Sequence, residues 1–96
     1  MAVGVVAKLK VQPGKGAEIE GVFAELGAQV KAKEPGNRLY QLCKSRSEAD
    51  LYVVMEIYDD QGALDAHMKS DHFRAAGAKM AACFAGRPEI QLFDTI

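Results

Sequence analysis

Apolar and polar residues alternate along this chain with a period that changes from one segment to the next. Residues 3–11 alternate with a period of two, which is typical of a half-buried strand. Residues 17–34 carry apolar side chains three and four positions apart, which predicts an amphipathic helix. The side-chain patterns of residues 38–46 and 51–58 predict two further strands, and the polar connection between them, residues 47–50, has the length of a hairpin loop.

The second half of the chain predicts a helix in two pieces and a last strand. Asp60 can cap the first piece, and Ser70-Asp71 breaks the helix and starts the second piece. Pro88 opens a strand at residues 89–96. The second piece is expected to bury Phe73, Ala76, Met80, Cys83 and Phe84. The predicted order βαββαβ, with its second helix broken, is the α+β ferredoxin-like plan with an antiparallel sheet.

The predicted strand at residues 51–58 is apolar on both faces, apart from Glu56. Such a strand has to be covered on both sides. The helices of one small domain can cover one side only. We therefore expect a homodimer that is joined through the sheet face.

Composition narrows the possible partners and the location of the protein. The net charge of −1 gives no basic field for a phosphate backbone, so no nucleic-acid partner is expected. The apolar runs are too short to span a membrane, and Met1–Lys8 lacks the basic region of a signal peptide. Cys43 and Cys83 show no zinc or redox spacing, which favours free thiols in a reducing cytoplasm. The length predicts a single domain, residues 1–96.

Both histidines of the chain fall within six positions, and this is where chemistry is expected. His67 lies on the apolar stripe of its helix, either as a general base or substrate anchor or as a buried structural histidine. His72 lies at a helix start, where it is expected either to contact a substrate or to be a structural histidine of the capping region. No metal site is expected, because this spacing shares no helical face well and no carboxylate or cysteine completes a ligand set.

Glu56 is the one charged residue of the most apolar strand. A buried carboxylate is expensive unless it is paired. It is expected either to form an ion pair at the dimer interface or to orient His67. The candidate interface partners are Lys8, Lys10 and Arg38. The three tyrosines, Tyr40, Tyr52 and Tyr58, suit hydrogen bonds to a ligand oxygen or packing at an edge. Residues that would line an apolar cavity, or simply form the core, are Phe23, Met55, Phe73, Met80 and Phe84.

An ordered set of short motifs resembles one known family. They are Glu34-Pro35-Gly36, Tyr40, Tyr52 followed by Glu56-Ile57-Tyr58-Asp59, and His67-x-x-Ser70-x-His72-Phe73. Together they resemble the antibiotic biosynthesis monooxygenase domain, a dimeric α/β-barrel group that includes small quinol monooxygenases. The resemblance covers essentially the whole chain. It implies two subunits meeting through their sheets, each with a pocket between sheet and helices, and oxidation of quinols or polycyclic phenols by O₂ without metal, flavin or haem.

The resemblance and the residues together predict a cofactor-independent monooxygenase acting on a small aromatic quinol or phenol. His67, Glu56 and Tyr40 are the expected catalytic residues. The expected substrate-binding residues are Tyr52, Tyr58, His72, Phe73, Phe23 and Met80. No cofactor and no metal are expected.

Two other functions stay open on the same scaffold. One is an isomerase of a small phosphorylated ketone of the autoinducer-2 type, with His67 and His72 moving protons and Arg74 or Arg87 holding the phosphate. The other is a dimeric ligand-binding or stress-associated module without turnover. Haem-degrading relatives use an asparagine, a tryptophan and a histidine, and the absence of tryptophan here argues against that activity.

Overall fold

The predicted order of strands and helices is confirmed in the computed structural model, which describes residues 1–96. The elements are β1 (Val3–Lys10), α1 (Gly16–Lys33), β2 (Asn37–Lys44), β3 (Leu51–Tyr58), α2 (Gln61–Lys69), α3 (Asp71–Ala81) and β4 (Glu89–Asp94). This is the α+β ferredoxin-like fold with its second helix broken into α2 and α3.

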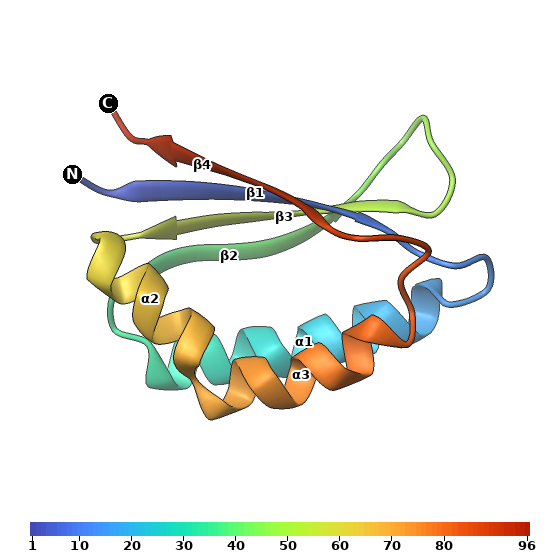
Figure 1. Ribbon diagram of the computed structural model, residues 1–96, viewed down its shortest axis with the longest axis horizontal. Helices are drawn as coiled ribbons and strands as arrows, with labels where there is room; N and C mark the ends of the chain where they lie inside the picture. Colours follow the sequence, from blue (N-terminus) through green and yellow to red (C-terminus); the bar gives the residue numbers. More distant parts are fainter.

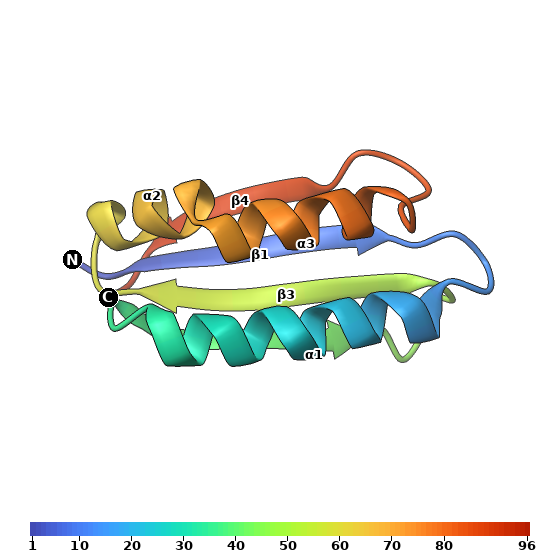
Figure 2. The ribbon, with the colours of Figure 1, turned by 90° about the horizontal axis from the view of Figure 1, so that it is seen from below.

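The strands form one antiparallel sheet in the order β2-β3-β1-β4. Figure 1 shows this sheet as one layer and all three helices as a second layer on one side of it. Seen from the helical side in Figure 2, α1 follows β3 and β2, whereas α3 lies over β1 and β4. Val5 pairs with Glu56 on one side and with Leu92 on the other, so these three side chains share the face that the helices cover.

The hydrophobic core lies between the helices and this face of the sheet. Ile19 and Val30 of α1 are 0% exposed and Leu26 is 2% exposed, at the seven- and four-residue spacing of one helical face. Full burial of a side chain of this size contributes about 1.5–3 kcal/mol. Tyr52 and Tyr58 of β3 are buried on the same side. The core thus holds α1 firmly against the strand that carries Glu56.

Two side chains cap the helices that carry the histidines. Asp60 Oδ1 accepts a hydrogen bond of 2.8 Å from the Ala63 amide at the start of α2. Ser70 Oγ accepts one of 3.2 Å from the Phe73 amide at the start of α3. Both caps were predicted from the sequence and are confirmed, and the break between the two helices follows from them.

The ends of several elements differ from the prediction. Helix α3 ends at Ala81, so Cys83 and Phe84 lie beyond it, where Phe84 forms an isolated bridge to Val11 of the first strand's extension. The helix has to end because the chain turns back toward the sheet there. Strand β2 ends at Lys44 rather than at residue 46, since the hydroxyl of Ser45 accepts hydrogen bonds from two following amides and starts the turn.

The outer face of the sheet is left uncovered by the helices of this chain (Figure 1). Leu39, Met55 and Phe93 are exposed by 39%, 45% and 49%. The register places all three on the face opposite to Glu56, because they alternate with Tyr40, Glu56 and Leu92 along their strands. None of the helices has the length and hydropathy that crossing a membrane requires.

Candidate active site

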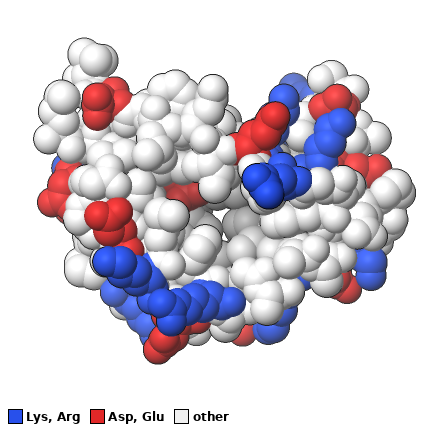
Figure 3. Space-filling model, viewed as in Figure 1, with Lys and Arg blue, Asp and Glu red and all other residues white.

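A cavity of about 590 Å³ lies between the sheet and the helices α2 and α3. Of its 19 lining residues 13 are hydrophobic. Strands β1 and β4 form its floor, with Val5, Ala7 and Leu92, and α2 and α3 form its wall, with Leu64 and Met80. In Figure 3 the molecule is hollowed between the sheet above and the helices below, and most atoms around the hollow carry no charge. A volume and lining of this kind suit a small, largely apolar molecule.

Three polar side chains meet at one end of this cavity. Tyr40 on β2 stands opposite Glu56 on the neighbouring strand β3, and His67 reaches the same place from α2. The ring centroid of His67 lies 5.3 Å from that of Tyr40 and 4.8 Å from that of Phe73. The sequence predicted these four residues as part of the site, and the fold brings them together.

Glu56 is a carboxyl group held in an apolar environment. Burial raises its pKa from 4.5 to about 7, against the opposing effect of a hydrogen bond that the Tyr58 hydroxyl donates to its Oε1 at 2.7 Å. The negative charge of Glu34 adds to the rise. A group with this pKa can both accept and return a proton near neutral pH.

The expected ion pair of Glu56 with a basic residue is wrong. Arg38 pairs with Asp59 instead, and Lys8 and Lys10 are exposed on the uncovered face of the sheet, whereas Glu56 points to the helices. The alternation of side chains along a strand explains the separation, because Lys8 and Glu56 lie on opposite faces.

Glu34 holds both histidines, a role that the sequence did not reveal. Its Oε2 lies 2.8 Å from Nδ1 of His67 and 2.5 Å from Nε2 of His72. The side chains of Glu34, His67 and His72 are 10%, 3% and 10% exposed. The expectation that Glu56 orients His67 is therefore wrong in its residue: Glu34 makes that contact. The expectation that no carboxylate joins the two histidines is also wrong. The break between α2 and α3 turns both rings toward the end of α1, where Glu34 lies.

Glu34, His67 and His72 are also the residues of this chain that together could hold a metal ion, with ligand atoms within 4.8 Å of one another. Ligands bound to zinc at about 2.0–2.1 Å in tetrahedral geometry lie roughly 3.4 Å apart. The separations of 2.8 Å and 2.5 Å here are shorter and are those of hydrogen bonds between the rings and the carboxylate. The arrangement is accordingly a hydrogen-bonded cluster.

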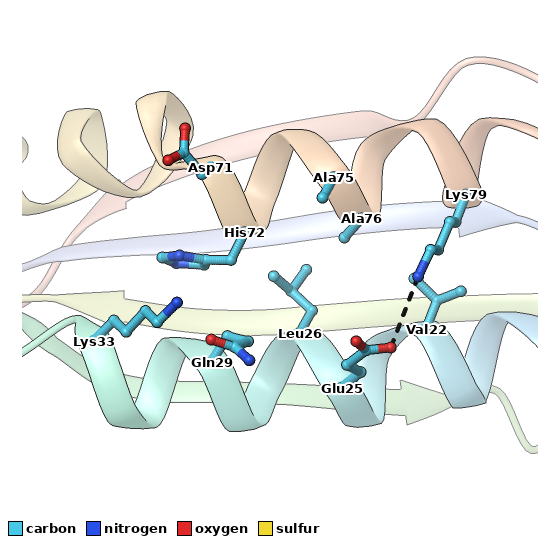
Figure 4. A pocket seen from close by; sticks show the side chains of 10 residues that line it. All are labelled: Val22, Glu25, Leu26, Gln29, Lys33, Asp71, His72, Ala75, Ala76 and Lys79. Carbon is cyan, nitrogen blue, oxygen red and sulfur yellow. Dashed lines mark ion pairs between the residues drawn. The ribbon is translucent and has the colours of Figure 1, made fainter.

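The two histidines line different hollows of the molecule. His67 lines the central cavity, and its Nε2 has no protein partner yet is not fully enclosed, so it is open to that cavity. His72 lines a separate groove of about 300 Å³ between α1 and α3. Figure 4 shows the ring of His72 reaching from α3 toward α1, where Lys33 and Gln29 lie opposite.

The remaining expected site residues divide into two groups. Phe23, Phe73, Met80 and Phe84 line the cavity. Tyr52 lies outside it and donates a hydrogen bond of 2.5 Å to Glu20, a contact that raises its pKa to about 12. Tyr58 is buried behind Glu56, and Met55 lies on the outer face of the sheet, so neither lines the cavity. Three further cavity residues were not predicted: Ile90 and Leu92 on β4 and Met68 on α2. The sequence shows that they are apolar but not whether a helix covers them or leaves them facing a cavity.

An apolar cavity with an imidazole, a carboxyl group and a phenol at one end is typical of a small-molecule site, and here it lies in a ferredoxin-like domain. The chain belongs to the family described as antibiotic biosynthesis monooxygenase, which matches residues 2–79. No curated protein is significantly similar to it in sequence.

Solved structures of the same fold include a protein of Caulobacter crescentus CB15 that has been assigned as an antibiotic biosynthesis monooxygenase. It is 49% identical, with a TM-score of 0.97 over 99% of this chain and 90% of that one. A conserved protein of Methanosarcina mazei Go1 is 29% identical, with a TM-score of 0.91 over 97% and 91% of the two chains. SnoaB, a cofactor-independent oxygenase of Streptomyces nogalater, is 26% identical, with a TM-score of 0.86 over 99% and 93%.

Proposed function

We propose that this protein is a cofactor-independent monooxygenase that oxidises a small aromatic phenol or quinol with O₂. The observation that carries the proposal is the cavity of about 590 Å³, apolar over most of its wall and furnished with His67, Glu56 and Tyr40 at one end. The family and the likeness to SnoaB, itself a cofactor-independent oxygenase, support the same reaction class.

The chemistry needs no external reductant when the substrate is an anthrol-like phenol with a C–H group para to its hydroxyl. Loss of the phenolic proton gives an electron-rich phenolate that reduces O₂ directly. The C–H carbon, a CH₂ group in the keto tautomer, becomes a C=O group and gives up four electrons. One oxygen atom of O₂ enters the product and the other leaves as water, so electrons and atoms balance.

His67 is the proposed base, because its Nε2 is open to the cavity while its Nδ1 is held by Glu34. Glu56, with its pKa raised to about 7, is placed to return a proton to the departing oxygen. Tyr40 would donate a hydrogen bond to the substrate, since burial raises the pKa of its hydroxyl and keeps it protonated. General acid and base assistance of this kind contributes about 10²–10⁴-fold to a rate.

The proposed working form is a cytoplasmic homodimer that closes an α/β barrel through the outer face of the sheet. Exposed apolar side chains on that face, among them Met55 and Phe93, support this assembly. The two free cysteines, Cys43 and Cys83, are compatible with a reducing compartment.

The isomerase alternative lacks a phosphate anchor in this cavity. No lysine or arginine lines it, and Arg74 and Arg87 both lie outside it. A phosphorylated substrate would leave its charge unpaired in an apolar space, which is expensive. The non-catalytic binding module remains the outcome that a lack of turnover would support.

The test is O₂ consumption with an anthrol, a naphthoquinol and a hydroquinone, without added cofactor and with a metal chelator present. We expect saturable uptake of one O₂ per anthrol, reduced about 10²-fold or more in His67→Gln. Gln keeps a donor for Glu34 but cannot act as a base. Arg74→Ala, on the exposed side of α3, is the matched control and should keep the wild-type rate. Uptake no faster than autoxidation would refute the oxygenase.

A further inference from the structure

The cluster formed by Glu34, His67 and His72 lies between the central cavity and the groove on the outer surface. His67 faces the central cavity and His72 faces the groove between α1 and α3 (Figure 4). One oxygen atom, Oε2 of Glu34, contacts both rings. The segments involved are far apart in sequence, since 33 positions separate Glu34 from His67 and 38 separate it from His72.

Glu34 lies where the local structure, a helix C-terminus, disfavours a carboxylate. It is the C-cap residue of α1, where the helix dipole disfavours negative charge. Its side chain is only 10% exposed, and its second oxygen, Oε1, is buried without a hydrogen-bond partner. A residue that breaks local rules in this way is expected where function requires it.

We propose that Glu34 and His72 are positioning residues that fix the tautomer of His67, an inference that rests on the proposed role of His67 as base. The carboxylate accepts a hydrogen bond from Nδ1–H of His67, so the neutral ring has its free electron pair on Nε2, which is open to the cavity. His72 donates its Nε2–H to the same oxygen and holds the carboxylate in place from the groove side. A carboxylate that orients a catalytic imidazole acts through the ring and touches no substrate.

The contacts that Glu34 makes with His67 and with His72 should differ in their effect on catalysis. Replacing the carboxylate of Glu34 by an amide leaves a weaker acceptor and adds an N–H donor, so the side chain no longer selects one tautomer of His67. Loss of the donor at His72 leaves the carboxylate present but less firmly held. The rate of the chemical step should therefore fall more for Glu34 variants than for His72 variants, while the apolar wall that binds substrate stays intact in both.

The first measurement is the tautomer of His67, read from long-range ¹H–¹⁵N correlations of the imidazole rings at a pH where both histidines are neutral. We expect the proton of wild-type His67 on Nδ1, and a shift toward the Nε2–H form in Glu34→Gln. Glu25→Gln is the matched control. It removes the same charge from the same helix and groove, where Glu25 is 70% exposed and pairs only with Lys79.

The second measurement is the split between kcat and KM in the O₂ assay. Glu34→Gln should lower kcat by about 10²-fold with KM within about threefold. His72→Phe should lower kcat by roughly tenfold, and His72→Gln, which keeps an N–H donor, should retain at least about fivefold more activity than His72→Phe.

A wild-type His67 with its proton on Nε2 would overturn the positioning role without any variant being needed. So would a Glu34→Gln protein that matches Glu25→Gln in both tautomer and kcat. If the wild-type protein consumes no O₂, the proposed function fails, whereas the tautomer measurement still decides the role of Glu34 and His72.

Discussion

The expected chemistry depends mostly on single residues at the cavity end, and Glu56 shows how the environment of a residue sets its pKa. Its side chain lies among apolar neighbours on the helix-facing side of the sheet, and burial raises its pKa to about 7. The hydroxyl of Tyr58, itself buried and with a raised pKa, stabilises the ionised form only in part. The same environment that suits Glu56 to the proposed proton transfer makes its ionised form unfavourable in the folded protein.

Glu56→Gln should remove a specific pH dependence of stability. The folded protein keeps a proton on Glu56 up to about pH 7, whereas the unfolded chain releases it near 4.5. The wild-type free energy of unfolding should therefore fall, relative to Glu56→Gln, as pH rises from about 5 to 8.5, by roughly 2–3 kcal/mol. Urea unfolding at both pH values, at one protein concentration, measures this. Equal pH slopes in the two proteins would show that Glu56 is not buried as described.

The sequence predicted part of this residue arrangement. Glu56 could be found as the one charged residue of an apolar strand and His67 as a histidine on the apolar stripe of a helix, whereas Tyr40 was indicated by the family motifs. Glu34 could not, since its contact with His67 depends on how the end of α1 meets the break between α2 and α3. The one local signal was a carboxylate at a helix C-terminus beside Pro35, where the helix dipole opposes it.

The helices and strands position these residues through a few close contacts, of which the one at Gly36 is the tightest. A Cβ atom at Gly36 would lie 2.7 Å from Cβ of Ala63 in the first turn of α2. Its carbonyl also accepts a hydrogen bond of 2.8 Å from the amide of Asp59. The absence of a side chain at Gly36 thus lets α2, with His67, approach the turn that follows Glu34.

Gly36→Ala should push α2 away and lower both stability and activity. We expect a loss of about 1–3 kcal/mol, which is typical of overpacking, together with a lower kcat because His67 moves from Glu34. Gly21→Ala is the matched control, since Gly21 lies within α1 with open space around its Cα. It should gain about 0.5–1 kcal/mol from helix propensity. Urea midpoints and the O₂ assay measure both variants, and a neutral Gly36→Ala would contradict the close contact.

Most element types were predictable from their hydrophobic period, and β3 from its run of apolar residues, whereas several ends were not. The end of α3 at Ala81 is set by the bridge between Phe84 and Val11, a contact between opposite ends of the sequence. The early end of β2 is set by the Ser45 hydroxyl. The side of β3 that Glu56 occupies also needed the structure, because both faces of that strand are apolar.

The whole molecule has a largely apolar cavity on its helical side and, on the other side, a sheet face with exposed apolar side chains. Nothing in this chain covers that outer face, on which Leu39, Met55 and Phe93 are exposed (Figure 1). A second copy meeting it face to face would bury these side chains on both subunits. Stable interfaces bury roughly 1,200–2,000 Å² in total, an extent that a four-stranded face can supply.

Met55→Glu should convert the proposed dimer to a monomer, because one carboxylate from each subunit would have to be buried in the interface, which is expensive. Met68→Glu is the matched control, since Met68 is also exposed, by 52%, but lies on α2, away from the sheet face. Sedimentation equilibrium at micromolar concentration gives the mass. A monomeric wild-type protein, or a Met55→Glu dimer, would contradict assembly through the sheet.

The fate of ¹⁸O₂ during turnover of an anthrol by the chelator-treated protein distinguishes an oxygenase from an oxidase. We predict that the new carbonyl group carries one ¹⁸O atom by mass spectrometry, that the second atom appears in water, and that no hydrogen peroxide accumulates. Formation of the same carbonyl group with its oxygen atom taken from water, together with two molecules of hydrogen peroxide from two O₂ per turnover, would contradict this prediction, because O₂ would then be only an electron acceptor and the cavity that of an oxidase.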